Sequence, residues 1–309
     1  MYPGAFLETL GDKPAVVMAN SGFTQTFAEL DAAANRLSRL LRAAGLQPGD
    51  HVALCMENHD RYLEVLWGCH YAGLVYTAAS SRLTSGELAY ILGDCAAKAF
   101  ITSKYVADQA AEIVADTPGV TMRLMLDGTI EGHDSYEEAT AKQSSEPLAD
   151  RVAGIDMLYS SGTTGRPKGV LHPFDPQPLE ASAMAVAGLL QLLFGATSES
   201  TYLSPAPLYH AAPLRFCMSM HTIGSTVVVM EHFDAEQYLR LVEAHRISHS
   251  QVVPTMFVRM LKLDPEVRAR YDVSSLECVV HAAAPCPIPV KRQMLDWWGP
   301  IIHEYYAGT

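Results

Sequence analysis

Short apolar runs alternate with amphipathic stretches along most of the chain. Residues 27–44 carry apolar side chains at helical spacing. They follow Thr26 and Glu29, a pair that predicts a capping box in which each side chain accepts a hydrogen bond from the other residue's backbone N–H. The apolar run 51–56 has the length of a strand, and a second helical pattern follows at 60–72. The chain therefore begins with helix, strand and helix in turn.

The same alternation continues further along the chain. Other apolar runs of strand length, separated by helical segments, lie at 98–103, 121–126, 226–230, 248–253 and 277–282. Strands that alternate with helices predict parallel sheets covered by helices. Ligands bind such sheets at the carboxyl ends of the strands, so we expect site residues in the loops that leave strands. The most apolar segment, 183–196, is too short for a membrane span and predicts a buried helix.

Composition narrows the class of protein. The 309 residues, 49% hydrophobic and 18% charged, are typical of a folded protein with two lobes. A net charge of -12 without any basic run argues against nucleic acid as a partner. The six cysteines form no C-x-x-C pair, which indicates reduced core residues, and the amino terminus lacks the pattern of a secretory signal. We expect a soluble, cytoplasmic protein with no transmembrane segment, and homodimer formation is left open.

A loop rich in glycine and hydroxyl groups follows a predicted strand at 156–159. Its candidate phosphate-binding residues are Ser160, Ser161, Gly162, Thr163, Thr164, Gly165 and Lys168. Glycines let backbone N–H groups approach anionic oxygens, hydroxyls add donors, and a lysine adds positive charge. Lys168 lies between Pro167 and Gly169, so the spacing excludes a Walker loop. By composition alone, a flexible surface loop is an equally good interpretation.

The string from Tyr159 to Val170, YSSGTTGRPKGV, resembles the signature of the adenylate-forming superfamily. That superfamily contains acyl-CoA ligases, luciferases and the adenylation domains of peptide synthetases. Residues 72–92 are similar to a segment of fatty-acyl-CoA ligases, and 207–210 (PLYH) resembles the family's next motif. The resemblance implies that His210 lies near the passage for the acyl group and the pantetheine of CoA. These matches favour the acyl-CoA ligase branch.

Two later segments resemble the family's adenine motifs. Residues 282–285 (AAAP) stand where the family has Gly-Gly-Ala-Pro, which implies that Ala283, Ala284 and Pro285 pass along the adenine. Alanine tolerates positive φ poorly, so either the backbone there is regular or the nucleotide fits differently. Residues 304–309 (EYYAGT) resemble the next motif. By that match Tyr306 stacks on adenine, and the hydroxyl of Thr309 faces a phosphate.

The resemblance also implies what the chain lacks. In the family a glutamate that helps to hold Mg²⁺ comes next, so we expect it just after Thr309 and assign no metal ligand within the chain. The barrel portion and the mobile carboxy-terminal domain with the catalytic lysine are expected to be missing, and no catalytic residue is assigned with certainty. The predicted fold class is α/β, with two interleaved lobes of sheet and helix that form part of an amino-terminal domain. One lobe is expected to cover 51–200, and the other 1–50 with 201–309.

The family reaction sets the functional expectation. ATP activates a hydrophobic carboxylic acid, expected to be a fatty acid, to an acyl-adenylate, and CoA then takes the acyl group as a thioester. ATP, Mg²⁺ and CoA are the implied cofactors, and this chain is expected to be a fragment with impaired activity. One alternative is an aryl- or amino-acid adenylation domain that loads a carrier protein. A second is a non-catalytic protein that binds a nucleotide or an acyl group.

Overall fold

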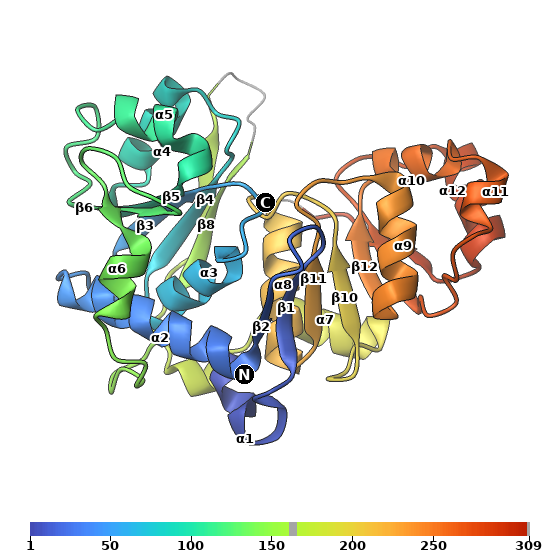
Figure 1. The fold of residues 1–309 in the computed structure, drawn as a ribbon, viewed down its shortest axis with the longest axis horizontal. Helices are drawn as coiled ribbons and strands as arrows, with labels where there is room; N and C mark the ends of the chain where they lie inside the picture. The colour runs from blue at the N-terminus through green and yellow to red at the C-terminus, as the bar shows by residue number, and fades with distance from the viewer. Residues whose placement is uncertain (161–165, 308–309) are drawn as a thin grey trace.

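Two sheets of seven strands form the framework of the computed structural model, which describes residues 1–160 and 166–307 (Figure 1). The first sheet has the order β7-β6-β5-β3-β4-β8-β9, and all its neighbouring strands are parallel except β8 and β9. Its strands are β3 (His51–Cys55), β4 (Val75–Ala79), β5 (Ala97–Ser103), β6 (Met122–Leu126), β7 (Asp134–Ser135), β8 (Ile155–Ser160) and β9 (Lys168–Leu171). The helices between these strands are α3 (Tyr62–Tyr71), α4 (Ser85–Asp94), η2 (Lys104–Val106), α5 (Ala107–Glu112) and α6 (Tyr136–Ala141).

The second sheet has the order β14-β13-β12-β10-β11-β1-β2, and only β2 runs antiparallel to its neighbour. Its strands are β1 (Pro14–Met18), β2 (Thr24–Thr26), β10 (Thr201–Ser204), β11 (Thr226–Val229), β12 (His249–Val252), β13 (Cys278–His281) and β14 (Ile302–Glu304). The remaining helices are η1 (Pro3–Phe6), α1 (Leu7–Leu10), α2 (Phe27–Ala43), η3 (Leu179–Ala181), α7 (Ala185–Phe194), α8 (Ala211–Ile223), α9 (Ala235–His245), α10 (Pro254–Leu261), α11 (Pro265–Arg268) and α12 (Ile288–Trp298).

The chain starts in one sheet, builds the other and then returns. Strands β1 and β2 extend the sheet whose other strands come from residues 201–304, and the first sheet is built in between. The predicted α/β class with two interleaved lobes is thereby confirmed. Helix α2 packs against α3 of the first lobe, where a side chain at Gly68 would meet Leu37 at 2.6 Å. The lobe boundaries at residues 50 and 200 stay a prediction.

The capping boxes predicted from the sequence are present at the start of two helices. Thr26 Oγ1 accepts a hydrogen bond from the backbone N–H of Glu29 at 3.2 Å, and the Glu29 carboxylate accepts one from the N–H of Thr26 at 2.8 Å. This capping box starts α2, and Thr84 with Glu87 forms a second one at α4. In the described part of the chain, no helix is both long and apolar enough to cross a membrane.

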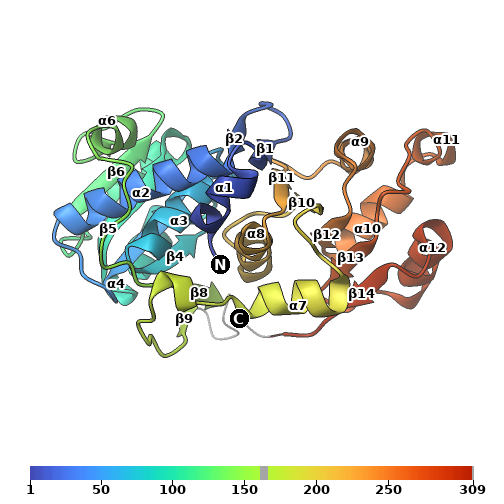
Figure 2. The same ribbon diagram turned by 90° about the horizontal axis from the view of Figure 1, so that it is seen from below.

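The prediction of a buried helix at 183–196 was only half right. Helix α7 forms there, but Leu190 is its one buried residue within the described structure. The side chains of Leu192 and Leu193 are 86% and 68% exposed. Figure 2 shows α7 on the face seen from below, beside α8. An apolar composition favours burial, but α7 packs mainly against α8 in the described structure, and its side chains Leu192 and Leu193 remain in solvent.

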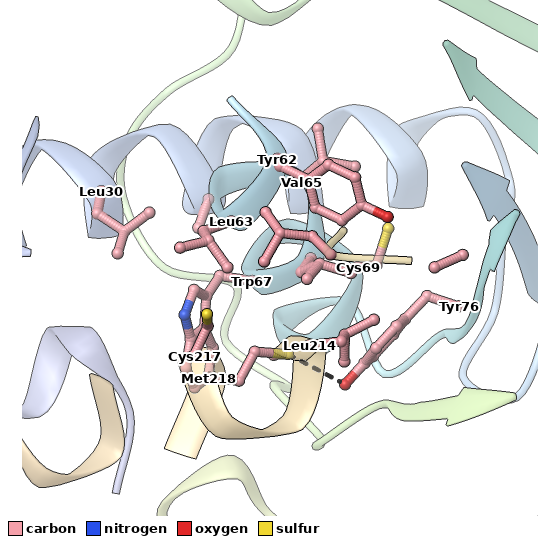
Figure 3. Packing of buried hydrophobic residues seen from close by; sticks show 14 of the residues in the cluster. Leu30, Tyr62, Leu63, Val65, Trp67, Cys69, Tyr76, Leu214, Cys217 and Met218 are labelled. Carbon is pink, nitrogen blue, oxygen red and sulfur yellow. Dashed lines mark hydrogen bonds between the residues drawn. The ribbon is translucent and has the colours of Figure 1, made fainter. Parts of the chain in front are cut away.

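The two lobes share one core, centred on α3 and α8 (Figure 3). Trp67 of α3 is fully buried, and its indole N–H donates a hydrogen bond to Nδ1 of His221 on α8 at 3.0 Å. Leu214 and Met218 of α8 point toward Tyr76 of β4. Because α8 belongs to the second lobe and β4 to the first, this packing fixes the position of α8 against the first sheet.

A buried histidine in the first lobe makes stability depend on pH. The His59 imidazole lies 2.9 Å from a carboxylate oxygen of Asp60 and 2.9 Å from one of Asp127. Burial opposes the charged ring, but the two carboxylates outweigh it and raise the pKa of His59 to about 9. The stabilisation is therefore complete below the unfolded pKa of about 6.5 and is lost as the pH rises through about 9.

We expect the free energy of unfolding to fall by about 2–3 kcal/mol between pH 6.5 and pH 10 through this group. Urea unfolding at a series of pH values measures this change, and replacement of His59 with glutamine should flatten the curve over that range. An unchanged slope in the variant would show that other groups cause the pH dependence.

Candidate active site

The predicted phosphate loop is closed at its base by an antiparallel ladder. Ser160 ends β8 and pairs with Lys168 at the start of β9, and the Ser160 hydroxyl donates to the Lys168 carbonyl at 3.5 Å. The side chain of Lys168 is exposed. The ladder therefore holds the two ends of the loop side by side at the carboxyl end of β8. The other predicted loop residues, Ser161, Gly162, Thr163, Thr164 and Gly165, lie outside the described residues.

Helix α4 supports both flanks of the loop. The Tyr159 hydroxyl donates a hydrogen bond to the Asp94 carboxylate at 2.6 Å, and the Tyr90 hydroxyl lies 3.3 Å from the Pro167 carbonyl oxygen. The guanidinium of Arg166 lies 5.1 Å from the centre of the Tyr90 ring. Burial raises the pKa of Tyr159, and its bond to Asp94 adds to the rise, so the phenol stays a donor. Sequence reasoning missed Asp94, because no local pattern marks a contact across 65 residues.

Gly169 is required for the close packing of this ladder. A Cβ atom on Gly169 would lie 2.2 Å from Met157 Cε and 3.0 Å from Tyr159 Cζ. Both neighbours are side chains of β8, the strand that pairs with β9. Gly169 therefore allows β9 to lie directly against the side chains of Met157 and Tyr159 on β8.

The predicted adenine residues come together at the carboxyl edge of the second sheet. His281 of β13 pairs in parallel register with Glu304 of β14, so the segments that follow the two strands leave the sheet side by side. Ala283, Ala284 and Pro285 follow β13, and Tyr306 follows β14. All four residues are exposed, and the Tyr306 ring stands fully in solvent. Thr309 lies outside the described residues.

Ala283 adopts the conformation of a glycine. Its φ is +73°, in the left-handed region, so of the two alternatives for the AAAP segment the regular backbone is excluded. A Cβ atom in this region costs about 1–2 kcal/mol. We expect Ala283→Gly to stabilise the fold by about 1 kcal/mol, because relief of the strain exceeds the added entropy of the unfolded chain. A denaturant midpoint that stays the same or falls in the variant would contradict this interpretation.

An ion pair ties the ends of β13 and β14 to helix α12. Lys291 Nζ lies 2.6 Å from a carboxylate oxygen of Glu304, and His281 Nε2 lies 3.8 Å from the same carboxylate. The bond from Lys291 lowers the pKa of Glu304. Burial lowers the pKa of His281, and the charge of Lys291 adds to that effect. At neutral pH the pair therefore consists of a charged lysine and a charged carboxylate beside a neutral ring.

His210 marks the start of α8. It is the N-cap residue, with an exposed side chain whose ring centre lies 4.2 Å from that of Tyr209. Partial desolvation lowers the pKa of His210, and the positive charge of Arg82 lowers it further. Since β10, β13 and β14 run parallel, His210 lies at the same edge of the sheet as the predicted adenine residues.

An ion pair between the lobes joins β8 to α8. Arg215 of α8 donates to the Asp156 carboxylate of β8 through Nη2 to Oδ2 at 2.7 Å and through Nε to Oδ1 at 3.3 Å. Asp156 lies four residues before Ser160, and Arg215 lies five residues after His210. The bidentate pair therefore joins the strand that carries the loop to the helix that begins at His210.

Within 1–160 and 166–307, no group of three or more histidine, cysteine, aspartate or glutamate side chains is placed to hold an ion. The expectation of a magnesium ligand just after Thr309 stays a prediction.

A family model described as AMP-binding enzyme matches residues 5–309. The chain belongs to this family. The solved N-terminal domain of FACL13 from Mycobacterium tuberculosis superposes with a TM-score of 0.83 at 25% identity, over 99% of this chain and 74% of that one. FadD1, a long-chain-fatty-acid-CoA ligase from Archaeoglobus fulgidus, superposes with a TM-score of 0.84 at 21% identity, over 99% and 63%. The latter likeness concerns the fold alone.

Relatives in the AMP-binding family include several CoA ligases. Feruloyl-CoA synthase from Amycolatopsis sp is 32% identical over 91% of this chain and 54% of its own length. The 2-succinylbenzoate–CoA ligase of Bacillus pumilus is 28% identical over 91% and 53%. The long-chain-fatty-acid–CoA ligase FadD13 of Mycobacterium tuberculosis is 29% identical over 88% and 52%. The chain thus spans about half the length of the curated relatives it matches.

Proposed function

We propose that the protein uses ATP to activate a hydrophobic carboxylic acid as an acyl-adenylate and then transfers the acyl group to CoA. The observation that carries this proposal is the phosphate-loop motif, closed by the pairing of Ser160 with Lys168 at the carboxyl end of β8. The names of the relatives, which are CoA ligases for several acids, support CoA as the acceptor. By the proposal, Ser160 to Gly165 and Lys168 bind the phosphates, together with Thr309.

The proposed reaction requires little covalent chemistry from the protein's own side chains. The acid's carboxylate attacks the α-phosphate, pyrophosphate leaves, and the charge that develops must be stabilised by fixed donors and cations. Lys168 is an exposed cation at the end of the loop, and Mg²⁺ would neutralise further phosphate charge when bound. No magnesium ligand is assigned among the described residues. Ala283, Ala284, Pro285 and Tyr306 are proposed to border the adenine, with His210 beside the passage for the acyl group and CoA.

Two hypotheses remain for the identity of the acid. A fatty acid is the first candidate, and FadD13 among the relatives supports it. An aromatic acid is the second, supported by the names feruloyl-CoA synthase and 2-succinylbenzoate–CoA ligase. A cytoplasmic location and a homodimer are also proposals, which fractionation of cells and light scattering of the purified protein would test.

Pyrophosphate exchange tests the proposed function directly. The longest natural form of the protein, incubated with ATP, labelled pyrophosphate and one acid at a time, should return label to ATP only with acids that it activates. Addition of CoA should then yield the matching thioester. Exchange without thioester would indicate a carrier-protein loading domain, and binding of ATP without exchange would indicate a non-catalytic protein.

A further inference from the structure

Asn58 is a buried asparagine that joins the carboxyl ends of the two sheets. It lies in the loop between β3 and α3 and is 8% exposed. Its Nδ2 donates to the carbonyl oxygens of Ala206 at 3.1 Å and Met230 at 2.8 Å, and its Oδ1 accepts from the backbone N–H of Leu208 at 2.8 Å. These partners follow β10 and β11 of the second sheet. One side-chain amide therefore fixes two loops of the second lobe to the first.

The loop that carries Asn58 is itself attached to the first sheet on both sides of that residue. The Glu57 carboxylate accepts a hydrogen bond from the hydroxyl of Ser103, at the end of β5, at 2.5 Å. The His59 ring lies 2.9 Å from the carboxylate of Asp127, which follows β6. Because the neighbours of Asn58 in the chain are held by these contacts, its amide has a defined position from which to hold another segment.

The segment that Asn58 holds leads directly to His210. The side chain of Leu208 is fully buried, and the backbone N–H of His210 donates to the Pro207 carbonyl at 3.2 Å, which closes a turn before α8. The His210 carbonyl then accepts from the N–H of Leu214 at 3.1 Å, within the first turn of α8. A shift of the Leu208 backbone would therefore move His210, two residues further along.

We propose that Asn58 is a positioning residue that holds His210 in place for the transfer of the acyl group to CoA. The inference rests on the proposed function, in which His210 borders the passage for the acyl group and CoA. In that transfer the CoA sulfur forms a bond to the acyl carbon, the bond from that carbon to the AMP oxygen breaks with its electron pair going to AMP, and the thiol proton passes to water. A misplacement of about 1 Å can slow such a step about 10²-fold.

The hydrogen bonds of Asn58 reach only one part of the candidate site. Among the described residues they go to the segment before His210 and to the residue that follows β11. They do not go to the ladder of β8 and β9 or to the segments after β13 and β14. Loss of the amide is therefore expected to slow transfer to CoA much more than formation of the acyl-adenylate.

Two half-reactions of the longest natural form test this difference. Pyrophosphate exchange measures formation of the acyl-adenylate, and thioester production from the isolated acyl-adenylate measures transfer, both with an acid that the wild type activates. Asn58→Ala should slow transfer about 10- to 100-fold and exchange less than about threefold. Asn58→Asp keeps the shape and the acceptor for Leu208, but its second oxygen faces two carbonyl oxygens. It should show the same imbalance, and it carries the test if Asn58→Ala does not fold.

Asn35→Ala is the matched control. Asn35 is also a buried asparagine, and its amide donates to the Asp31 carboxylate at 2.9 Å within α2. Its loss removes a buried hydrogen bond, as the loss of Asn58 does, but far from His210 in the chain. The variant should therefore be less stable than the wild type and keep the wild-type ratio of the two half-reactions.

Amide hydrogen exchange on the chain without ATP or CoA tests the position of the segment by itself. The Leu208 N–H should exchange slowly in the wild type, because it donates to a buried side chain. In Asn58→Ala it should exchange about 10-fold faster, the effect of one hydrogen bond, and in Asn35→Ala it should change no more than the amides of β3 do.

Equal losses of exchange and transfer in Asn58→Ala, or a Leu208 amide that exchanges fast in the wild type, would overturn the inference. A wild type without pyrophosphate exchange would instead refute the proposed function. In that case the Leu208 amide alone decides whether Asn58 holds the segment before His210.

Discussion

Replacing Lys168 with alanine is expected to lower ATP-dependent pyrophosphate release by about 10²- to 10³-fold, the usual cost of removing one preorganised stabilising group. Lys168 is exposed at the first position of β9, and its backbone is fixed opposite Ser160. The side chain can therefore reach a bound polyphosphate while its base stays in place. The loss should appear mainly in kcat, because the charge that the lysine stabilises grows toward the transition state.

Lys262→Ala provides the control for general charge effects. Lys262 is also an exposed lysine, at the C-cap of α10, and its replacement should leave the rate unchanged. Both variants should unfold at the wild-type denaturant concentration, since neither lysine is buried. If Lys168→Ala released pyrophosphate within about threefold of the wild-type rate, the loop would be a structural hairpin, and the proposed function would need another phosphate site.

Replacing Glu64 with alanine is expected to lower the free energy of unfolding by about 3–5 kcal/mol. The Glu64 carboxylate is 2% exposed and accepts hydrogen bonds from Gln25 Nε2 at 3.0 Å, from the Tyr136 hydroxyl at 2.7 Å and from Arg61 Nη1 at 3.2 Å. The three donors come from β2 of the second sheet, from α6 and from the residue before α3. Alanine would leave two buried donors unpaired and a cavity between the lobes.

Urea unfolding measures the effect as a lower midpoint with an unchanged slope. Arg270→Ala is a suitable comparison, because Arg270 and Glu236 form an exposed ion pair at 3.4 Å whose loss should cost less than about 1 kcal/mol. A Glu64→Ala midpoint close to that of Arg270→Ala would mean that water replaces the carboxylate, and that the network does not hold the lobes together.

Periodicity and caps allowed much of the fold to be predicted. Thr26 with Glu29 and Thr84 with Glu87 are local signals, and both start helices at the expected residue. The alternation of strand and helix predicted two parallel sheets, because each crossover needs a helix. The exposure of Leu192 on α7 was not predictable, since burial depends on what packs against a helix and not on its composition alone.

The motifs of the candidate site could be predicted from the sequence, but the backbone conformation and the long-range contacts of the site could not. The sequence left the backbone at Ala283 undecided, because an alanine by itself gives no sign of positive φ. The support that Tyr90 and Asp94 give to the loop joins segments far apart in the chain, and one sequence holds no record of such contacts.

The ladder between β8 and β9 limits the number of residues that the loop between them can contain. Seven residues separate Ser160 from Lys168, and both partners are fixed in register. An insertion that slipped β9 by one position would turn Lys168 to the opposite face of the sheet and drive a side chain against Met157 in place of Gly169. Natural variants of this protein should therefore rarely gain or lose a residue between Ser160 and Lys168.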